Sequence, residues 1–123
     1  VKLEPEFDKL WSEIKPYIES RILVAHNASF DINVLRKTLR HYKLEIPSAR
    51  YYCTYQIARL VWQESPKFSL DYLCNEMGFE FSHHKADSDA EACARLLLHE
   101  AEQLGVETFE QLKRKLKIRS PKL

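Results

Sequence analysis

The sequence lacks the features that would indicate a membrane protein or a disulfide-stabilised one. No apolar run approaches the roughly 18 residues that a membrane helix needs, and no signal-peptide pattern opens the chain. The three cysteines, Cys53, Cys74 and Cys93, are an odd number without a CxxC pair. We therefore expect reduced thiols and a cytoplasmic location rather than a disulfide framework. A zinc site that combined the first two cysteines with His83 and His84 is disfavoured, because no pair has ligand-like spacing.

The chain also lacks a strong net charge, although its charges are unevenly distributed. With 123 residues and a formal net charge of +1, it has the size of one domain that buries its own core. Residues 113–123, KRKLKIRSPKL, hold six Lys or Arg and no acid, so the rest of the chain carries about −5. Such an asymmetry is typical of a linker or of a tail that faces nucleic acid, and it also fits a solvated helix end that frays.

Hydrophobic periodicity predicts an α/β protein with two strands and no internal repeat. Strands are predicted at 22–26 and 49–54, where short apolar runs are rich in residues that favour β-structure. Two strands are few for a free-standing sheet. The predicted helices cover residues 6–19, 29–43, 55–62, 70–77, 86–104 and 107–116.

Local signals refine the ends and faces of these helices. Pro16 should kink or shorten the last turn of the first helix, and Ser69 can cap the helix that precedes Gly78. Ser29 is the expected cap of the helix over 29–43. The inward residues of that helix are predicted to be Phe30, Val34, Leu35, Leu39 and Tyr42, and its other face holds Arg36, Lys37, Arg40 and Lys43.

Asp31 and Asp89 each fall in the first turn of a predicted helix, on its apolar side. The helix dipole favours a carboxylate there by about 0.3–1 kcal/mol, which by itself explains many such residues. Asp31, however, shares its stripe with Val34 and Leu35, and Asp89 shares its stripe with Cys93. A carboxylate that faces apolar surface is costly unless it is paired. The two acids therefore suggest oxygen ligands for a hard divalent cation, Mg²⁺ or Mn²⁺.

A histidine lies close to the second of these acids. His84 precedes Asp89 by five residues, in the loop that leads into the long helix. The ordinary pKa of histidine, about 6.5, suits proton abstraction from water near neutral pH. We interpret His84 as a candidate general base, and the alternative is that His83 and His84 are only polar loop residues. His26 is expected to bond to the backbone through its ring at the end of a strand, and we assign it no catalytic role.

Two motifs in the chain resemble those of a known family. HNASFD (His26 to Asp31) and HKADSDA (His84 to Ala90) are similar to the second and third exonuclease motifs of the DEDD superfamily. The similarity is to its DEDDh, or DnaQ-like, branch, which includes the proofreading ε subunit of bacterial DNA polymerase III, ribonuclease T and oligoribonuclease. The resemblance implies an RNase H-like α/β fold with a five-stranded mixed sheet. This chain would hold a helix-rich C-terminal portion of it, with about two strands.

The resemblance also implies roles for individual residues. Asp31 would help to hold one divalent ion and Asp89 would bind the ion that activates water, in a two-ion site whose other two acids come from the first motif of the family. His84 would be the general base. Asn27 and Phe30 match motif positions near the 3′-terminal nucleotide. The implied reaction is two-metal 3′→5′ hydrolysis of single-stranded DNA that releases nucleoside 5′-monophosphates, in proofreading or repair.

The motifs leave the substrate and the partners open. An RNA exonuclease of the ribonuclease T or oligoribonuclease type shares both motifs, so the sequence does not separate DNA from RNA. A non-catalytic module that binds a DNA polymerase or another subunit is an alternative of a different class. A bacterial cytoplasmic location is the expectation for all three interpretations.

The chain departs from the family in its first motif, an Asp-x-Glu on the first strand of the sheet. Only EPE at 4–6 and DSD at 87–89 come near it, and neither lies on an apolar strand. We therefore expect residues 1–106 to be an exonuclease domain without its N-terminal strands, weakly active or inactive by itself. Residues 107–123 would be a basic helix and tail, or a linker to a further domain. The exposed edge of the strand at 22–26 should favour a homodimer or a swapped assembly.

Overall fold

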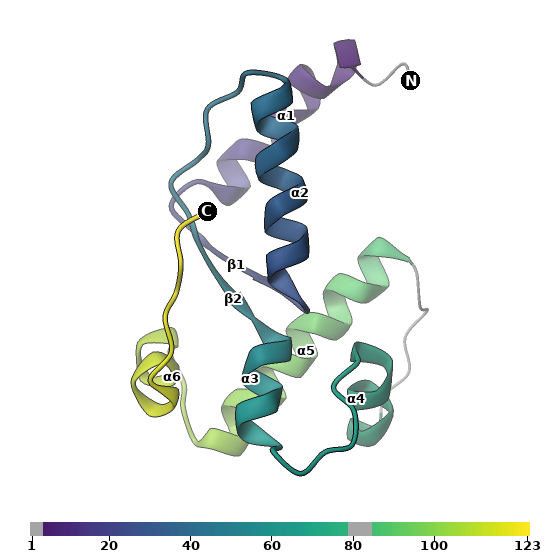
Figure 1. The fold of residues 1–123 in the computed structure, drawn as a ribbon, viewed down its shortest axis with the longest axis vertical. Coiled ribbons are helices and arrows are strands. Elements are labelled where there is room, and N and C mark those ends of the chain that lie inside the picture. Colours follow the sequence, from purple (N-terminus) through teal and green to yellow (C-terminus); the bar gives the residue numbers. More distant parts are fainter. Residues whose placement is uncertain (1–3, 79–84) are drawn as a thin grey trace.

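The computed structural model describes residues 4–78 and 85–123, which form six helices and two strands (Figure 1). Both strands were predicted within two residues of their observed ends, and α5 has the predicted bounds. The elements are α1 (Glu4–Ile18), β1 (Ile22–Ala25), α2 (Ala28–His41), β2 (Arg50–Cys53), α3 (Thr54–Val61), α4 (Leu70–Met77), α5 (Ala86–Leu104) and α6 (Phe109–Leu116).

The two strands form a parallel sheet, and α2 makes the crossover between them. Ile22 pairs with Arg50 at one end and Ala25 pairs with Cys53 at the other, so the carboxyl ends of both strands finish side by side. In Figure 1 the sheet lies between α1 and α2 at one end of the molecule and α3–α6 at the other. The predicted helix-rich α/β fold is confirmed.

The core is built mainly below the sheet, where α5 packs against α3, α4 and α6. One cluster joins β2, α3 and α6 through Tyr52, Ile57 and Leu112. A second cluster joins α3, α4 and α5 through Ala58, Leu73 and Leu96. The apolar stripes of four helices are thus buried against one another, and α5 is the element they share.

At the other end of the molecule, α1 packs on the last turn of α2 through aromatic rings. The rings of Phe7 and Tyr42 stack with their centroids 4.7 Å apart, and Trp11 beside them is buried. Pro16 lies inside α1, which ends two residues later at Ile18. No helix in the described part of the chain is both long and apolar enough to span a bilayer.

The basic C-terminal segment packs against the rest of the chain. The backbone N–H of Tyr51 donates to the carbonyl of Pro121 (3.0 Å), and the N–H of Leu123 donates to the carbonyl of Ala49 (2.9 Å). Residues 121–123 therefore cover the edge of β2, and Leu112 of α6 is part of the core. Within the described ranges, β1 has no strand on its other side. Whether a further domain follows residues 107–123 stays a prediction.

The start of α2 and part of its buried face differ from the prediction, although Leu39 is buried as predicted. Its N-cap is Asn27, in a left-handed conformation (φ 65°), not Ser29, because the chain turns directly after β1 and the helix begins one residue earlier than expected. Its buried residues are Ala28, Ile32 and Leu39. The predicted inward residues Phe30 and Val34 are 67% and 50% exposed. Periodicity gives the spacing of an apolar stripe, but the strand-to-helix turn decides which of two neighbouring stripes faces the sheet.

The ends of the shorter helices follow local signals. Gly78 ends α4 with a φ of 83°, as predicted, a left-handed value that glycine adopts without steric cost. Ser69 is the N-cap residue of α4, although its side chain accepts no capping hydrogen bond. At the start of α6, Thr108 and Gln111 form a reciprocal capping box.

Candidate active site

Asp31 lies in the first turn of α2, directly beyond the carboxyl end of β1. The left-handed turn at Asn27 starts the helix at once, so the carboxylate follows the strand end by only six residues. Asn is among the few non-glycine residues that adopt this conformation at low cost. The residue as a whole is exposed, yet partial burial of its carboxyl raises the pKa of Asp31. The group therefore faces protein surface on at least one side.

Asp89 lies in the first turn of α5 and is half-buried. Its Oδ1 atom is buried and has no hydrogen-bond partner among the described residues. A buried carboxylate oxygen without a donor is costly, so such an atom indicates a missing partner. Asp87, two residues earlier on the same turn, is exposed.

The structure brings these two acids together in one cavity of about 400 Å³. The cavity lies beyond the carboxyl end of β1, between the starts of α2, α4 and α5. Ligand sites in open α/β sheets commonly lie at this edge. The side chains that line it belong to Val24, Ala25, His26, Asp31, Leu70, Asp89, Ala90 and Cys93.

One wall of this cavity is held by a chain of hydrogen bonds through His26. Its Nε2 lies 2.6 Å from the carbonyl oxygen of Phe68 and its Nδ1 lies 2.9 Å from Thr54 Oγ1. A carbonyl only accepts, so Nε2 donates to Phe68. Nδ1 shares a hydrogen bond with the Thr54 hydroxyl, which also lies within donating distance (3.4 Å) of the Ala25 carbonyl. Cys93 Sγ lies 3.5 Å from Thr54 Oγ1, and either atom can be the donor in this contact. Burial lowers the pKa of His26, and the bond to Phe68 opposes this shift.

This network fixes the position of His26 and leaves it without a free nitrogen. The predicted bond from its ring to the backbone is confirmed, and the acceptor is Phe68, directly before the N-cap of α4. The ring also contacts Tyr55 edge-on, with centroids 5.5 Å apart. His26 therefore ties the end of β1 to α3 and to the start of α4, and forms a rigid part of the cavity wall.

Two predicted site residues, Asn27 and Phe30, do not line this cavity, and a third cannot be placed. His84, together with His83, lies outside the described residues. Asn27 is exposed at the N-cap of α2, and Phe30 projects from the first turn with most of its ring in solvent. The sequence interpretation missed Leu70 as a lining residue, and the available signal was its place directly after a capping serine at a helix start.

A larger cavity, about 660 Å³, lies between α3, α4 and α5 and is lined in part by Trp62, Tyr72 and His99. Neither Asp31 nor Asp89 lines this larger cavity, so the cavity with the greater volume is not the one that contains the two acids. We assign the candidate site to the smaller cavity, because it alone of the two combines a desolvated carboxyl with an unpartnered buried carboxylate oxygen.

The residues present fit a divalent cation in kind but are few in number. Carboxylate oxygens are the ligands that Mg²⁺ and Mn²⁺ prefer, and Asp89 has an oxygen without another partner. Within residues 4–78 and 85–123 there is no group of three or more His, Cys, Asp or Glu able to hold a metal. Asp31 and Asp89 can therefore supply part of a coordination shell that needs further ligands.

Comparison with known proteins agrees with the motifs and with this site. The sequence profile of the RNase T family, described as Exonuclease, matches residues 1–97. The chain belongs to the RNase T exonuclease family. Its membership confirms the DEDDh-type resemblance carried by the two motifs.

Two curated relatives cover most of this chain. It is 30% identical over 112 residues to a PolC-type DNA polymerase III of Staphylococcus saprophyticus and 26% identical over 112 residues to a 3′-5′ exonuclease DinG of Staphylococcus haemolyticus. Each comparison covers 88% of this chain, but only 8% and 12% of those relatives. The chain therefore spans about a tenth of the length of the curated relatives that it matches.

A solved family structure supports the fold. Exonuclease X in complex with 5′ overhanging duplex DNA superposes with a TM-score of 0.61 and 28% sequence identity. The comparison covers 84% of this chain and 59% of that one. The helices and the two-stranded parallel sheet thus correspond to part of an RNase H-like exonuclease fold, as the motifs predict.

Proposed function

We propose that the protein is a divalent-metal-dependent 3′→5′ exonuclease that acts on single-stranded DNA ends in proofreading or repair. The observation that carries this proposal is the pair Asp31 and Asp89 in one cavity, with a buried Oδ1 of Asp89 that lacks a partner. The names of the relatives, a PolC-type polymerase and a 3′-5′ exonuclease, support the same reaction. The bacterial cytoplasm is the proposed location.

Each motif residue has a proposed task in this reaction. Asp31 and Asp89 would hold Mg²⁺ or Mn²⁺, which when bound lower the pKa of water and neutralise the leaving oxygen. His84 would accept the proton of the attacking water. Asn27 and the exposed ring of Phe30 would contact the 3′-terminal nucleotide, the ring by stacking on its base. The product would be a nucleoside 5′-monophosphate.

The substrate and the partner are part of the proposal. An RNA 3′-exonuclease is the second candidate, since both motifs are shared with ribonuclease T and oligoribonuclease. A DNA polymerase is the proposed protein partner, on the ground that the matched segment of one relative lies within a PolC-type polymerase. A non-catalytic interaction module would need neither of the two acids in the cavity.

The test compares Asp89→Asn with Asp87→Asn in the longest natural chain that contains these residues. With Mn²⁺ and a 5′-labelled single-stranded oligonucleotide, we expect shortening from the 3′ end. Asp89→Asn should lower the rate at least about 100-fold, since the loss of even an outer-shell partner costs about 10–100-fold at a metal site. Asp87→Asn, at an exposed position on the same helix turn, should leave the rate unchanged.

Three results would contradict parts of the proposal. Equal rates in the two variants would refute the role of Asp89. Binding without any cleavage would favour the interaction module, and preference for an RNA competitor over DNA would favour the ribonuclease. We expect the 123-residue chain by itself to be weakly active or inactive, and robust digestion that depends on His84 would refute that expectation.

A further inference from the structure

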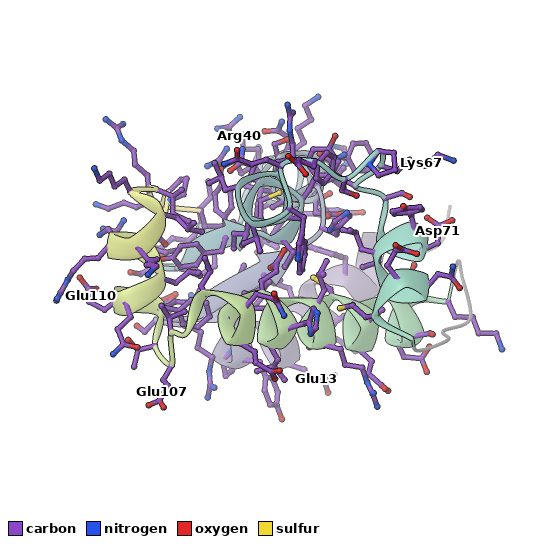
Figure 2. All side chains as sticks on the ribbon, turned by 90° about the horizontal axis from the view of Figure 1, so that it is seen from below. Glu13, Arg40, Lys67, Asp71, Glu107 and Glu110 are labelled. Atoms are coloured by element: carbon purple, nitrogen blue, oxygen red, sulfur yellow. The ribbon has the colours of Figure 1, made fainter. Side chains whose placement is uncertain are left out.

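The structure gathers basic side chains from four elements onto one surface. We call it the tail surface, and its cations come from α2, β2, α6 and the segment after α6. Figure 2 shows α6 at one side of the molecule, where side chains ending in nitrogen point outward and Glu107 and Glu110 lie beside them. The cations of the tail surface are Arg36, Arg50, Lys113, Arg114, Lys115, Lys117, Arg119 and Lys122.

Two hydrogen bonds hold the arginines of α2 and β2 against the C-terminal segment. Arg36 Nη2 donates to the carbonyl of Lys122 over 2.8 Å, and Arg50 Nη1 donates to the carbonyl of Ser120 over 2.6 Å. Both acceptors are neutral backbone oxygens, so the two guanidinium charges are positioned without being neutralised. No ion pair between a tail-surface cation and a carboxylate is found in the described residues. Like charges held together in this way favour an anionic partner.

The tail surface reaches the first turn of α2, where the candidate active site begins. Arg119 and Ser29 line the same small cavity of about 80 Å³. Ser29 lies two residues before Asp31 and Arg36 lies five residues after it, so both project from the side of α2 that faces away from Asp31. The tail surface therefore lies across the start of α2 from the acidic cavity.

A strand whose 3′ end lies in the acidic cavity would cross the start of α2 to reach these cations. We propose that the tail surface binds the phosphate backbone of a nucleic-acid strand whose 3′ end lies in the cavity of Asp31 and Asp89. This inference rests on the proposed function for the position of the 3′ end. It assigns α6 and the C-terminal segment a binding role that neither motif indicates.

The surface fits a nucleic acid better than a membrane. Helices that lie on membranes insert exposed apolar side chains beside their basic residues. None of the exposed large hydrophobic residues of the described chain lies beyond Leu98. In α6, Phe109 and Leu116 are packed around the core residue Leu112, so its basic outer face offers nothing to insert.

The test measures how binding of a strand depends on salt. A fluorescent 12-nucleotide single-stranded DNA is titrated with the chain in EDTA, which prevents cleavage, at several KCl concentrations. In the variant Lys113→Gln/Arg114→Gln/Arg119→Gln, the slope of log K against log salt should become less negative by about 2, since each lost phosphate contact removes about 0.7. The control variant Lys9→Gln/Lys15→Gln/Lys67→Gln removes the same charge from other surfaces, and its slope should stay unchanged.

A second variant guards against loss of the fold. Lys113, Arg114 and Lys115 lie in the last turn of α6 and also stabilise its dipole. The variant Lys117→Gln/Arg119→Gln/Lys122→Gln, which leaves that turn unchanged, is therefore measured in parallel. Circular dichroism identifies the variants that keep their helices, and these should show the reduced slope. A reduced slope in a folded variant supports the inference.

Two outcomes would overturn the inference. The first is a salt slope in both folded tail variants that equals the slope of the parent chain. The second is a reduction of the slope in the control variant as large as that in the tail variants. Phosphatidylserine vesicles are tested with the same variants, and loss of vesicle binding with intact DNA binding would assign the surface to a membrane instead. Absent nuclease activity together with a reduced slope would refute the proposed function and support the tail surface.

Discussion

Glu100 leads to the sharpest prediction about stability. It lies in α5, is fully buried, and neither carboxyl oxygen has a hydrogen-bond partner among the described residues. Burial, with a smaller contribution from Cys53, raises the pKa of Glu100 from 4.5 to about 9. The folded protein therefore holds this carboxyl in its neutral form at pH 7, whereas the unfolded chain ionises it.

This shift makes the protein less stable as the pH rises. Below pH 4.5 both states hold the proton, and the carboxyl causes no pH-dependent loss. Between pH 4.5 and about 9 only the unfolded chain releases it, so the free energy of unfolding falls by about 1.4 kcal/mol per pH unit. At pH 7 the accumulated loss is about 3 kcal/mol, a large share of the roughly 5–15 kcal/mol that stabilises a typical domain.

Glu100→Gln tests this reasoning because the amide keeps the shape of the side chain and cannot ionise. Urea unfolding at pH 5.5, 7.0 and 8.5 gives the stability of each protein. The advantage of the variant over the parent chain should grow by about 4 kcal/mol from pH 5.5 to pH 8.5, from the same linkage. Glu102→Gln, at an exposed position two residues along α5, is the control and should track the parent. An advantage of Glu100→Gln that does not change with pH would refute the argument.

Two further predictions concern the core and the free strand edge. Leu96→Ala should lower the free energy of unfolding, measured in urea, by about 2–5 kcal/mol, because Leu96 is fully buried. The control Leu98→Ala, at a 70% exposed position on the same helix, should change this free energy by less than about 0.5 kcal/mol. Equal losses in the two variants would contradict the assignment of the core. The free edge of β1 should mediate self-association, which sedimentation velocity would detect as a rise in mass with protein concentration. Ile22→Lys at this edge should weaken the association. A monomer at every concentration would count against it.

The sequence predicted the parts of the fold that local signals determine. The 19-residue helix α5 had the right bounds because its apolar period is long and Gly105 ends it. The face of α2 was right for Leu39 but wrong for Phe30 and Val34, because two overlapping stripes, one with Phe30 and one with Ile32, both have helical spacing. Only the turn at Asn27 distinguishes them, and a left-handed asparagine is not a property that periodicity reveals.

For the candidate site, the sequence predicted the acids but not what surrounds them. Asp31 and Asp89 could be linked because each begins a helix with apolar residues three and four positions later. The bonds from His26 to Thr54 and Phe68 join residues 28 and 42 positions apart. Such pairs depend on how the chain folds back on itself, and no local pattern encodes them. The same applies to the C-terminal segment, which looked like a free tail and instead covers β2.

The register of the sheet explains why these separate features meet in one place. Ala25 pairs with Cys53, so β1 and β2 end together, and α2 and α3 start side by side from adjacent strand ends. Two hydrogen bonds cross this junction: the N–H of Ala28 donates to Cys53 Sγ (3.3 Å), and the ring of His26 bonds to the hydroxyl of Thr54. The residues that follow β1 are thus bonded to the last residue of β2 and to the first residue of α3. A slip of one residue would turn the side chains of β1 to the opposite face and break both contacts. The position of Asp31 therefore depends on the pairing of β1 with β2 as much as on its own motif.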